Sequence, residues 1–60
     1  MLNTEMIISL SKWISNWKNT YGEIPSINES ITWIEWQFND IKISKNDKDS
    51  IQTILLFHKD

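Results

Sequence analysis

His58 is the residue with the widest range of chemistry in this sequence, because imidazole can transfer protons or bind metal ions near neutral pH. The chain contains one histidine and no cysteine, so the usual partners of a metal-binding histidine are missing. Asp47 and Asp49 could form an acid–base pair, but closely spaced acids of this kind are more often a solvated face. Gly22 is the one glycine, which excludes a glycine-rich phosphate loop. We therefore expect no enzymatic activity, no metal site and no cofactor.

A second kind of chemistry, recognition by aromatic side chains, is indicated by two tryptophans in the segment ITWIEWQFND. Together with two acids they are spaced four, three and four residues apart, as Glu29, Trp33, Trp36 and Asp40. On a helix this spacing forms a single strip, roughly opposite the isoleucines of the same segment. Tryptophan is a preferred anchor at protein interfaces, where charged groups form the rim. The strip therefore predicts a partner-binding surface.

Burial in the core is the alternative for both tryptophans, and the sequence favours it for Trp33 but not for Trp36. The middle helix of a three-helix bundle contacts both neighbours and needs a wide apolar arc, which favours a core position for Trp33. Trp36 lies almost opposite Ile27, so its burial requires a loop folded over it. Burial and exposure of Trp36 are equally consistent with the sequence, and the interface hypothesis depends on its exposure.

Ile8 and Leu56 are apolar residues that fall outside the stripes of their own helices. Ile8 lies about 100° beyond the edge of the stripe in the first helix. A single exposed apolar residue needs no functional explanation. If Ile8, Trp36 and Leu56 meet on one face, however, they form the apolar centre of an interface.

Apolar residues in the first third of the chain recur with helical spacing and occupy an arc of about 120°. Asn3 or Thr4 can cap the start of this helix, and Gly22 followed by Pro25 can end it. We expect a helix from Thr4 to Tyr21. Its apolar stripe comprises Met6, Ile7, Leu10, Trp13, Ile14, Trp17 and Tyr21.

A capping box marks the start of the second helix. Ser26 and Glu29 have the spacing at which each side chain can bond a backbone N–H of the first turn. We expect this helix to cover residues 26–40. An apolar stripe with steps of four, three, four and three faces one side of it and comprises Ile27, Ile31, Ile34, Phe38 and Ile41.

The polar segment IKISKNDKDS, residues 41–50, predicts a loop into a third helix, with Ser44 and Asp47 as one possible cap. That helix places four residues on one face, namely Ile51, Ile54, Leu55 and His58. We therefore expect one all-α domain covering residues 1–60, a small three-helix bundle.

An α+β fold, with the first helix packed on a short antiparallel sheet, is the alternative. The segments WIEWQF and IKIS both alternate around Asn39 and Asp40, and IQTILLFH is rich in residues that favour strands. This fold ranks second, because Asn-Asp is a poorer hairpin turn than Asn-Gly. The capping box and the helical stripe, in contrast, agree with each other.

The charge of the chain limits the class of partner. The formal net charge is −2, and the second helix carries Glu29, Glu35 and Asp40 without a lysine. Nucleic acid requires a basic surface, so direct binding to nucleic acid is not expected. The first helix has too few lysines to attract an anionic membrane, and no apolar run is long enough to span one. Since the start of the chain lacks a signal-peptide pattern, we expect a cytoplasmic protein.

These observations predict a small modulator or inhibitor that binds another protein through aromatic anchors and selects a basic surface with its acids. A nucleic-acid-handling protein presents such a surface, and small acidic chains of this type suit a phage or another mobile element. The alternatives are a self-associating structural protein, such as a homodimer, and a helix-turn-helix DNA-binding regulator. The candidate partner-binding residues are Trp36, Trp33, Glu29, Asp40, Ile8 and Leu56.

Overall fold

The computed structural model describes residues 2–39 and 41–59 of the chain, and its regular elements are three α-helices. Helix α1 covers Thr4–Tyr21, α2 covers Ile27–Gln37, and α3 covers Lys45–His58. No strand occurs in the part of the chain that the structure describes. The expected all-α three-helix bundle is confirmed, and the α+β alternative is wrong.

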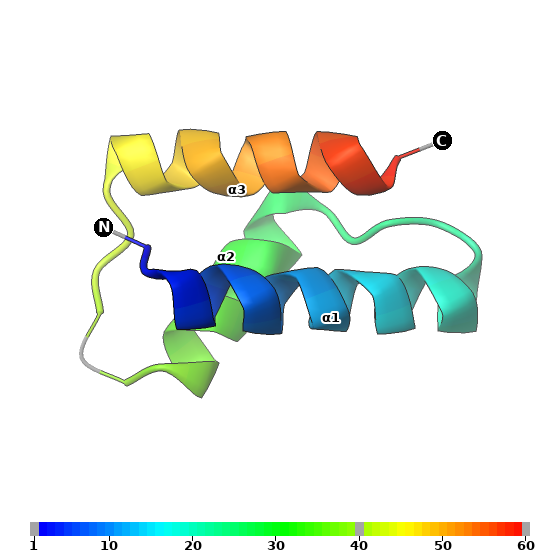
Figure 1. Ribbon diagram of the computed structural model, residues 1–60, viewed down its shortest axis with the longest axis horizontal. Coiled ribbons are helices and arrows are strands. Elements are labelled where there is room, and N and C mark those ends of the chain that lie inside the picture. The colour runs from blue at the N-terminus through cyan, green and yellow to red at the C-terminus, as the bar shows by residue number, and fades with distance from the viewer. Residues whose placement is uncertain (1, 40, 60) are drawn as a thin grey trace.

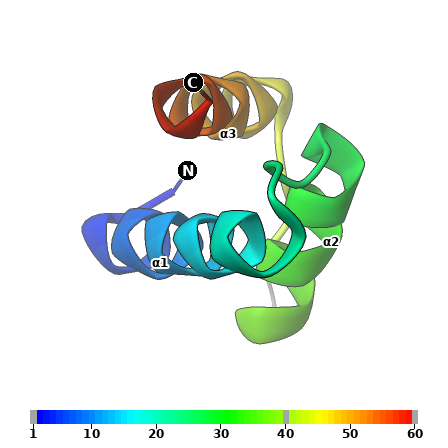
Figure 2. The same cartoon turned by 90° about the vertical axis from the view of Figure 1, so that its right-hand side faces the viewer.

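The three helices surround one apolar core. Helices α1 and α3 lie next to each other and run in the same direction (Figure 1), while α2 crosses both at a steep angle on one side (Figure 2). The molecule measures 30 × 19 × 19 Å along its principal axes. The fully or almost fully buried apolar side chains come from all three helices and are Leu10, Ile14, Ile34, Ile51 and Leu55.

Both ends of α1 are fixed by local signals that the sequence contains. The side chain of Asn3 accepts a hydrogen bond from the backbone N–H of Met6, at 2.9 Å, and so satisfies one of the unpaired donors of the first turn. At the other end Gly22 adopts a left-handed conformation with φ of 80°. Its N–H donates to the carbonyl of Lys18 at 2.7 Å. The predicted boundaries of this helix are confirmed.

Helix α2 begins as predicted but ends earlier. The capping box is present: the N–H of Ser26 donates to Glu29 Oε1 at 3.0 Å, and the N–H of Glu29 donates to Ser26 Oγ at 3.1 Å. The expected end at residue 40 is wrong, because Phe38 leaves the helical conformation with φ of −116° and ψ of 88°. This change of direction lets the following residues Ile41 and Ile43 pack against the core from a non-helical segment.

The segment IKIS, which suggested a strand, is neither a strand nor a helix. Ile41 and Ile43 are half-buried and pack against the core, and Lys42 between them is exposed. The alternation of the sequence therefore reflects alternate burial in the connection before α3.

Helix α3 begins at Lys45, so the expectation that residues 41–50 form a loop is wrong for their second half. The physical reason is a second capping box. The N–H of Ser44 donates to Asp47 Oδ2 at 3.2 Å, and the N–H of Asp47 donates to Ser44 Oγ at 3.1 Å. This cap starts the helix within the polar segment. Across the described residues, no helix is both long enough and apolar enough to cross a bilayer.

Candidate functional site

Four aromatic side chains form a continuous row across α1 and α2. On α1 the rings of Trp13 and Trp17 have centroids 5.4 Å apart, and those of Trp17 and Tyr21 are 4.6 Å apart, both pairs being tilted by about 50°. On α2 the ring of Trp33 stacks on Trp13, with centroids 5.0 Å apart and 13° between the planes. Because the members of α1 are spaced by four residues, they lie along one side of that helix. We call these four residues the aromatic row.

A shallow groove of about 370 Å³ lies beside this row, where α1 and α2 meet. We call it the aromatic groove, and its lining residues are Trp13, Trp17, Asn28, Glu29, Thr32 and Trp33. The three tryptophans are half-buried, so each keeps part of its ring in contact with solvent. Among the described residues that line the groove, Glu29 is the one that carries a charge. The groove is therefore an aromatic surface with a carboxylate at its edge.

The carboxylate of Glu29 is held in place by the fold. Its Oε1 atom accepts the N–H of Ser26 at 3.0 Å as half of the capping box. Although the side chain is exposed, this bond restricts its rotation. The start of α2 therefore positions a negative charge next to the indoles of the groove.

Trp36 is 75% exposed and takes no part in the aromatic row described above. It lies two residues after the buried Ile34, which on a helix places it on the opposite side from the core. It is also one turn beyond Thr32 and Trp33, which line the aromatic groove. Trp36 is therefore an exposed indole one helical turn beyond two residues of the groove.

The structure brings some of the predicted site residues together and separates others. Glu29 and Trp33 both line the aromatic groove, and Trp36 lies one turn further along α2. Trp33 is half-buried, so it serves both the packing of α1 on α2 and the groove. Asp40, the fourth member of the predicted strip, lies outside the described residues.

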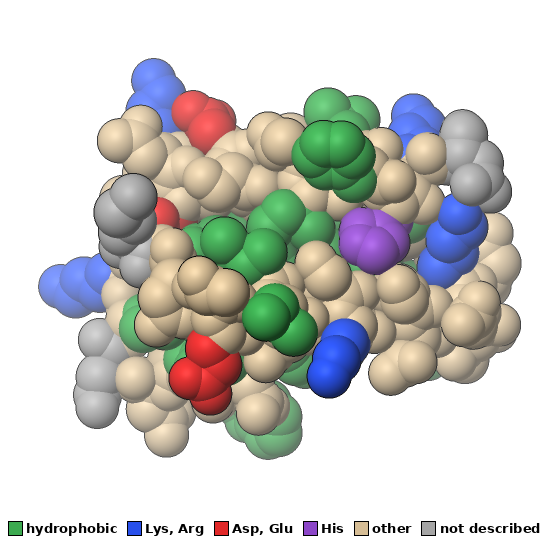
Figure 3. Space-filling view, viewed as in Figure 1, with side chains coloured by type: hydrophobic (Ala, Val, Ile, Leu, Met, Phe, Trp, Pro, Cys, Tyr) green, Lys and Arg blue, Asp and Glu red, His purple; other side chains and the backbone are tan. Residues whose placement is uncertain are grey.

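Ile8 and Leu56 lie away from the groove. They are 50% and 57% exposed, on α1 and α3, and neither residue lines the groove. Leu56 instead borders a hollow of about 310 Å³ together with Thr53 and Phe57, which we call the α3 patch. Figure 3 shows the hydrophobic side chains of one face in separate groups over α1, α3 and the seam between them.

Trp13 and Trp17 are further candidates for the site, although their spacing predicts only that they belong to an apolar stripe. They belong to the apolar stripe of α1, but both are half-buried and line the groove. The signal that identifies them is the spacing of Trp13, Trp17 and Tyr21, which places three aromatic rings in one row. Tyr21, at the end of that row, is 64% exposed.

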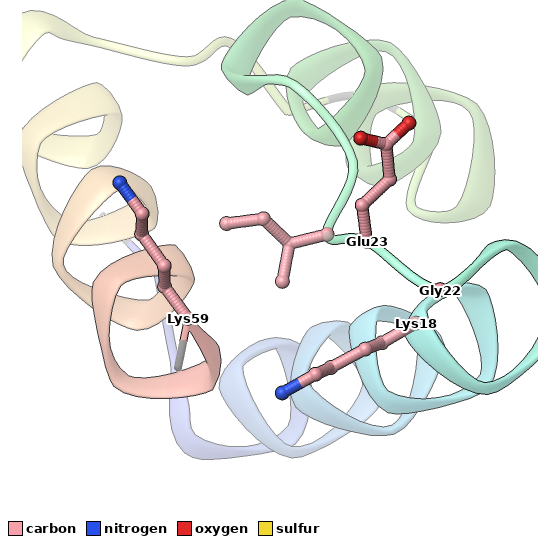
Figure 4. A pocket seen from close by; sticks show the side chains of 5 residues that line it. Lys18, Gly22, Glu23 and Lys59 are labelled. Atoms are coloured by element: carbon pink, nitrogen blue, oxygen red, sulfur yellow. The ribbon is translucent and has the colours of Figure 1, made fainter.

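A cavity of about 300 Å³ lies where the ends of α1 and α3 meet, lined by Lys18, Gly22, Glu23, Ile24 and Lys59. Figure 4 shows Lys18 extending from α1 toward the end of α3, while Glu23 points away from it. The Nζ atom of Lys18 donates to the carbonyl of His58 at 2.9 Å. Because the last carbonyls of a helix lack intrahelical donors and carry partial negative charge, this lysine stabilises the end of α3.

His58 lies at the same junction of α1 and α3. It is half-buried, and its Nδ1 atom is 3.5 Å from Ser15 Oγ on α1. In residues 2–39 and 41–59, no group of three or more histidine, cysteine or acidic side chains is arranged to hold a metal ion. Its contact with Ser15 joins α3 to α1.

Asp47 is a buried acid that connects the start of the chain to α3. Its side chain is 4% exposed and accepts N–H groups from Ser44 and from Leu2, the latter at 3.1 Å. The hydrogen bond from the Ser44 backbone is the main cause that holds the pKa of Asp47 below its ordinary value, against the opposing effect of burial. The sequence predicts the cap but not this contact with Leu2, because the two residues are 45 positions apart.

Comparison of the chain with protein family models, with curated proteins and with solved structures finds no match.

Proposed function

We propose that this chain is a small protein-binding modulator or inhibitor that docks on a larger partner through the aromatic groove and Trp36. The observation that carries the proposal is the 75% exposure of Trp36, one helical turn along α2 from a groove lined by three further tryptophans. Leaving an indole in water forgoes the free energy of burying about 150–250 Å² of ring surface. Tryptophans are among the residues that contribute most to binding at protein interfaces.

The charge on α2 supports a partner with a basic surface. Within α2 the charged residues are Glu29 and Glu35, both acidic and both exposed. A complementary basic surface speeds encounter and excludes acidic competitors. A nucleic-acid-handling protein fits this requirement, and a phage or another mobile element in the cytoplasm of its host is a source that suits a short acidic inhibitor. The same acids repel phosphate, which disfavours the DNA-binding alternative.

A comparison of two exposed aromatic residues tests the proposal. The partner is recovered by affinity capture with the full chain from cells that express it, and its affinity is then measured with purified variants. Trp36→Ala is expected to weaken binding by about 30-fold or more, since hot spots contribute ~2 kcal/mol or more. The matched control is Phe57→Ala, at an 84% exposed position of α3 outside the groove.

The control variant is expected to bind as the unmodified chain does. Equal losses for the two variants, or an unfolding transition shifted by Trp36→Ala without any change in affinity, would contradict the proposed binding surface. Titration at several salt concentrations adds a second criterion, because a complex formed on a basic surface weakens as ionic strength rises.

Self-association through the α3 patch is the second candidate, and the exposure of Leu56 and Phe57 favours it. Stable interfaces bury about 1,200–2,000 Å² in total, more than two such side chains per copy can supply. We therefore rank it below the aromatic groove. Sedimentation over a concentration series separates the two candidates: a dimer that Leu56→Ser dissociates and Trp36→Ala leaves intact would place the interface on α3.

A further inference from the structure

We propose that the aromatic groove is a receptor for a cationic side chain, and specifically for the guanidinium group of an arginine presented by the partner. This inference rests on the proposed function and names the chemistry of the contact at its centre. The observations behind it are the indole rings that line the groove, the carboxylate of Glu29 beside them, and a second groove next to Trp13 and Trp33 that contains a lysine.

The indole rings that line the groove are suited to binding a cation. A cation is attracted to the negative face of an aromatic ring, and indole is the best of the natural rings for this contact. Trp13, Trp17 and Trp33 all line the groove, and none of them is fully buried. Trp13 and Trp33 stack within 13° of parallel, so they present a rigid wall whose side chains lose little freedom when a ligand binds.

Glu29 adds a negative charge to the groove. Its carboxylate is the charged group among the described residues that line the groove, and the capping bond to Ser26 already holds it there. A carboxylate beside an indole surface combines ionic attraction with cation–π attraction at one position. Asn28 and Thr32, the remaining lining residues, are neutral and can accept further hydrogen bonds from a guanidinium.

A second groove next to the same tryptophan pair differs from the aromatic groove in charge. This second groove, of about 300 Å³, also contains Trp13 and Trp33 but is lined by Lys12 in place of an acid. The two grooves therefore share part of their aromatic wall and differ in the sign of the charge beside it. A cation is attracted to the groove that contains Glu29 and repelled from the one that contains Lys12.

Arginine fits this site better than lysine. Its guanidinium is planar, stacks on aromatic faces and carries several N–H donors that can bond a carboxylate while the plane lies against a ring. Lysine presents a compact, strongly hydrated charge, which loses more hydration in an aromatic groove.

The test uses the full chain labelled with ¹⁵N and titrated with N-acetyl-arginine amide at millimolar concentrations. The matched ligand is the citrulline analogue, which has nearly the same shape without the charge. A third titration uses the corresponding lysine compound, Nα-acetyl-lysine amide. We expect saturable shifts of NMR signals from Trp17, Trp33 and Thr32 with the arginine compound, smaller shifts with the lysine compound, and none with the citrulline analogue.

Two variants isolate the charge from the fold. Glu29→Gln removes the charge and keeps the cap, because glutamine also serves at this position of a capping box. It is expected to weaken arginine binding roughly two- to fivefold, the range of an exposed ion pair. Glu5→Gln, at an exposed position of α1 that does not line the groove, is expected to leave binding unchanged.

Equal binding of arginine and citrulline, equal effects of the two variants, or shifts centred on Lys12 or the α3 patch would overturn the inference. The result also separates this inference from the proposed function. A partner that depends on Trp36 while the arginine compound leaves the groove unperturbed refutes only the cation site. Arginine binding in the groove supports the cation site even if no partner depends on Trp36.

Discussion

The indole of Trp33 on α2 stacks on the indole of Trp13 on α1, with ring centroids 5.0 Å apart. This contact joins two helices and at the same time forms the wall of the aromatic groove. Under the proposed function, these two residues therefore contribute both to stability and to recognition. Trp36, which is 75% exposed, would contribute to recognition alone.

The first prediction concerns this difference between tryptophans. Trp33→Ala is expected to lower the free energy of unfolding by about 2–4 kcal/mol, toward the lower end of large aromatic truncations because the ring is only half-buried. Trp36→Ala is expected to change it by no more than about 0.5 kcal/mol. Urea denaturation monitored by circular dichroism measures both values.

A double-mutant cycle that combines Trp13→Ala with Trp33→Ala is expected to give a coupling of about 0.5–1.5 kcal/mol for the stacked pair.

Similar losses of stability for Trp33→Ala and Trp36→Ala would show that Trp36 is packed in solution. Additive effects of the Trp13 and Trp33 variants would show that the two rings do not interact.

A second prediction follows from the left-handed backbone at the end of α1. Gly22 has φ of 80°, and no atom lies within 4 Å of the position that a Cβ would occupy. Gly22→Ala therefore meets no steric obstacle, and its cost is that of the backbone conformation alone, about 1–2 kcal/mol. Gly22→Asn is the control and is expected to cost less, since asparagine tolerates this conformation. Thermal unfolding compares the two, and equal transition temperatures would contradict the backbone explanation.

The sequence predicts the end of a helix where a local capping residue marks it. Asn3 and Gly22 fix α1, and Ser26 with Glu29 fixes the start of α2, through hydrogen bonds to residues at most four positions away. The end of α2 lacks a comparable signal: Phe38 is neither a glycine nor followed by a proline. The helix ends there while Phe38 and Ile41 both pack on the core, an arrangement set by tertiary contacts that periodicity does not record.

The candidate site was predictable only in part, for the same reason. The helical register of Glu29, Trp33 and Trp36 follows from spacing on one element, and α2 does hold these three residues in a regular helix. The contribution of Trp13 and Trp17 depends on how α1 meets α2, which no spacing within one helix defines. Whether Ile8, Trp36 and Leu56 share a face likewise depends on the arrangement of three helices and not on spacing within one of them.

The third prediction concerns the junction of α1 and α3. Lys18→Met keeps the length of the side chain and removes the donor to the His58 carbonyl. It is expected to lower the free energy of unfolding by about 0.5–1.5 kcal/mol, the range of a single hydrogen bond. Amide hydrogen exchange should accelerate in the last turn of α3, where the Lys59 N–H bonds the carbonyl of Leu55. Lys12→Met, an exposed position of α1, is the control, and equal acceleration in both variants would argue against a role for the Lys18 bond.

The final prediction is a pH dependence that originates at Asp47. The N–H of Ser44 lowers the pKa of this buried carboxyl in the folded chain, so folding favours its ionised form. The resulting stabilisation is fully present above the unfolded pKa of about 4 and is lost as the pH falls through the lower folded pKa. The stability difference between the unmodified chain and Asp47→Asn is therefore expected to be largest near neutral pH and to shrink below about pH 4. Thermal unfolding between neutral and acidic pH measures it, with the exposed Asp49→Asn as control. A difference that stays constant with pH would show that ionisation of Asp47 does not stabilise the fold.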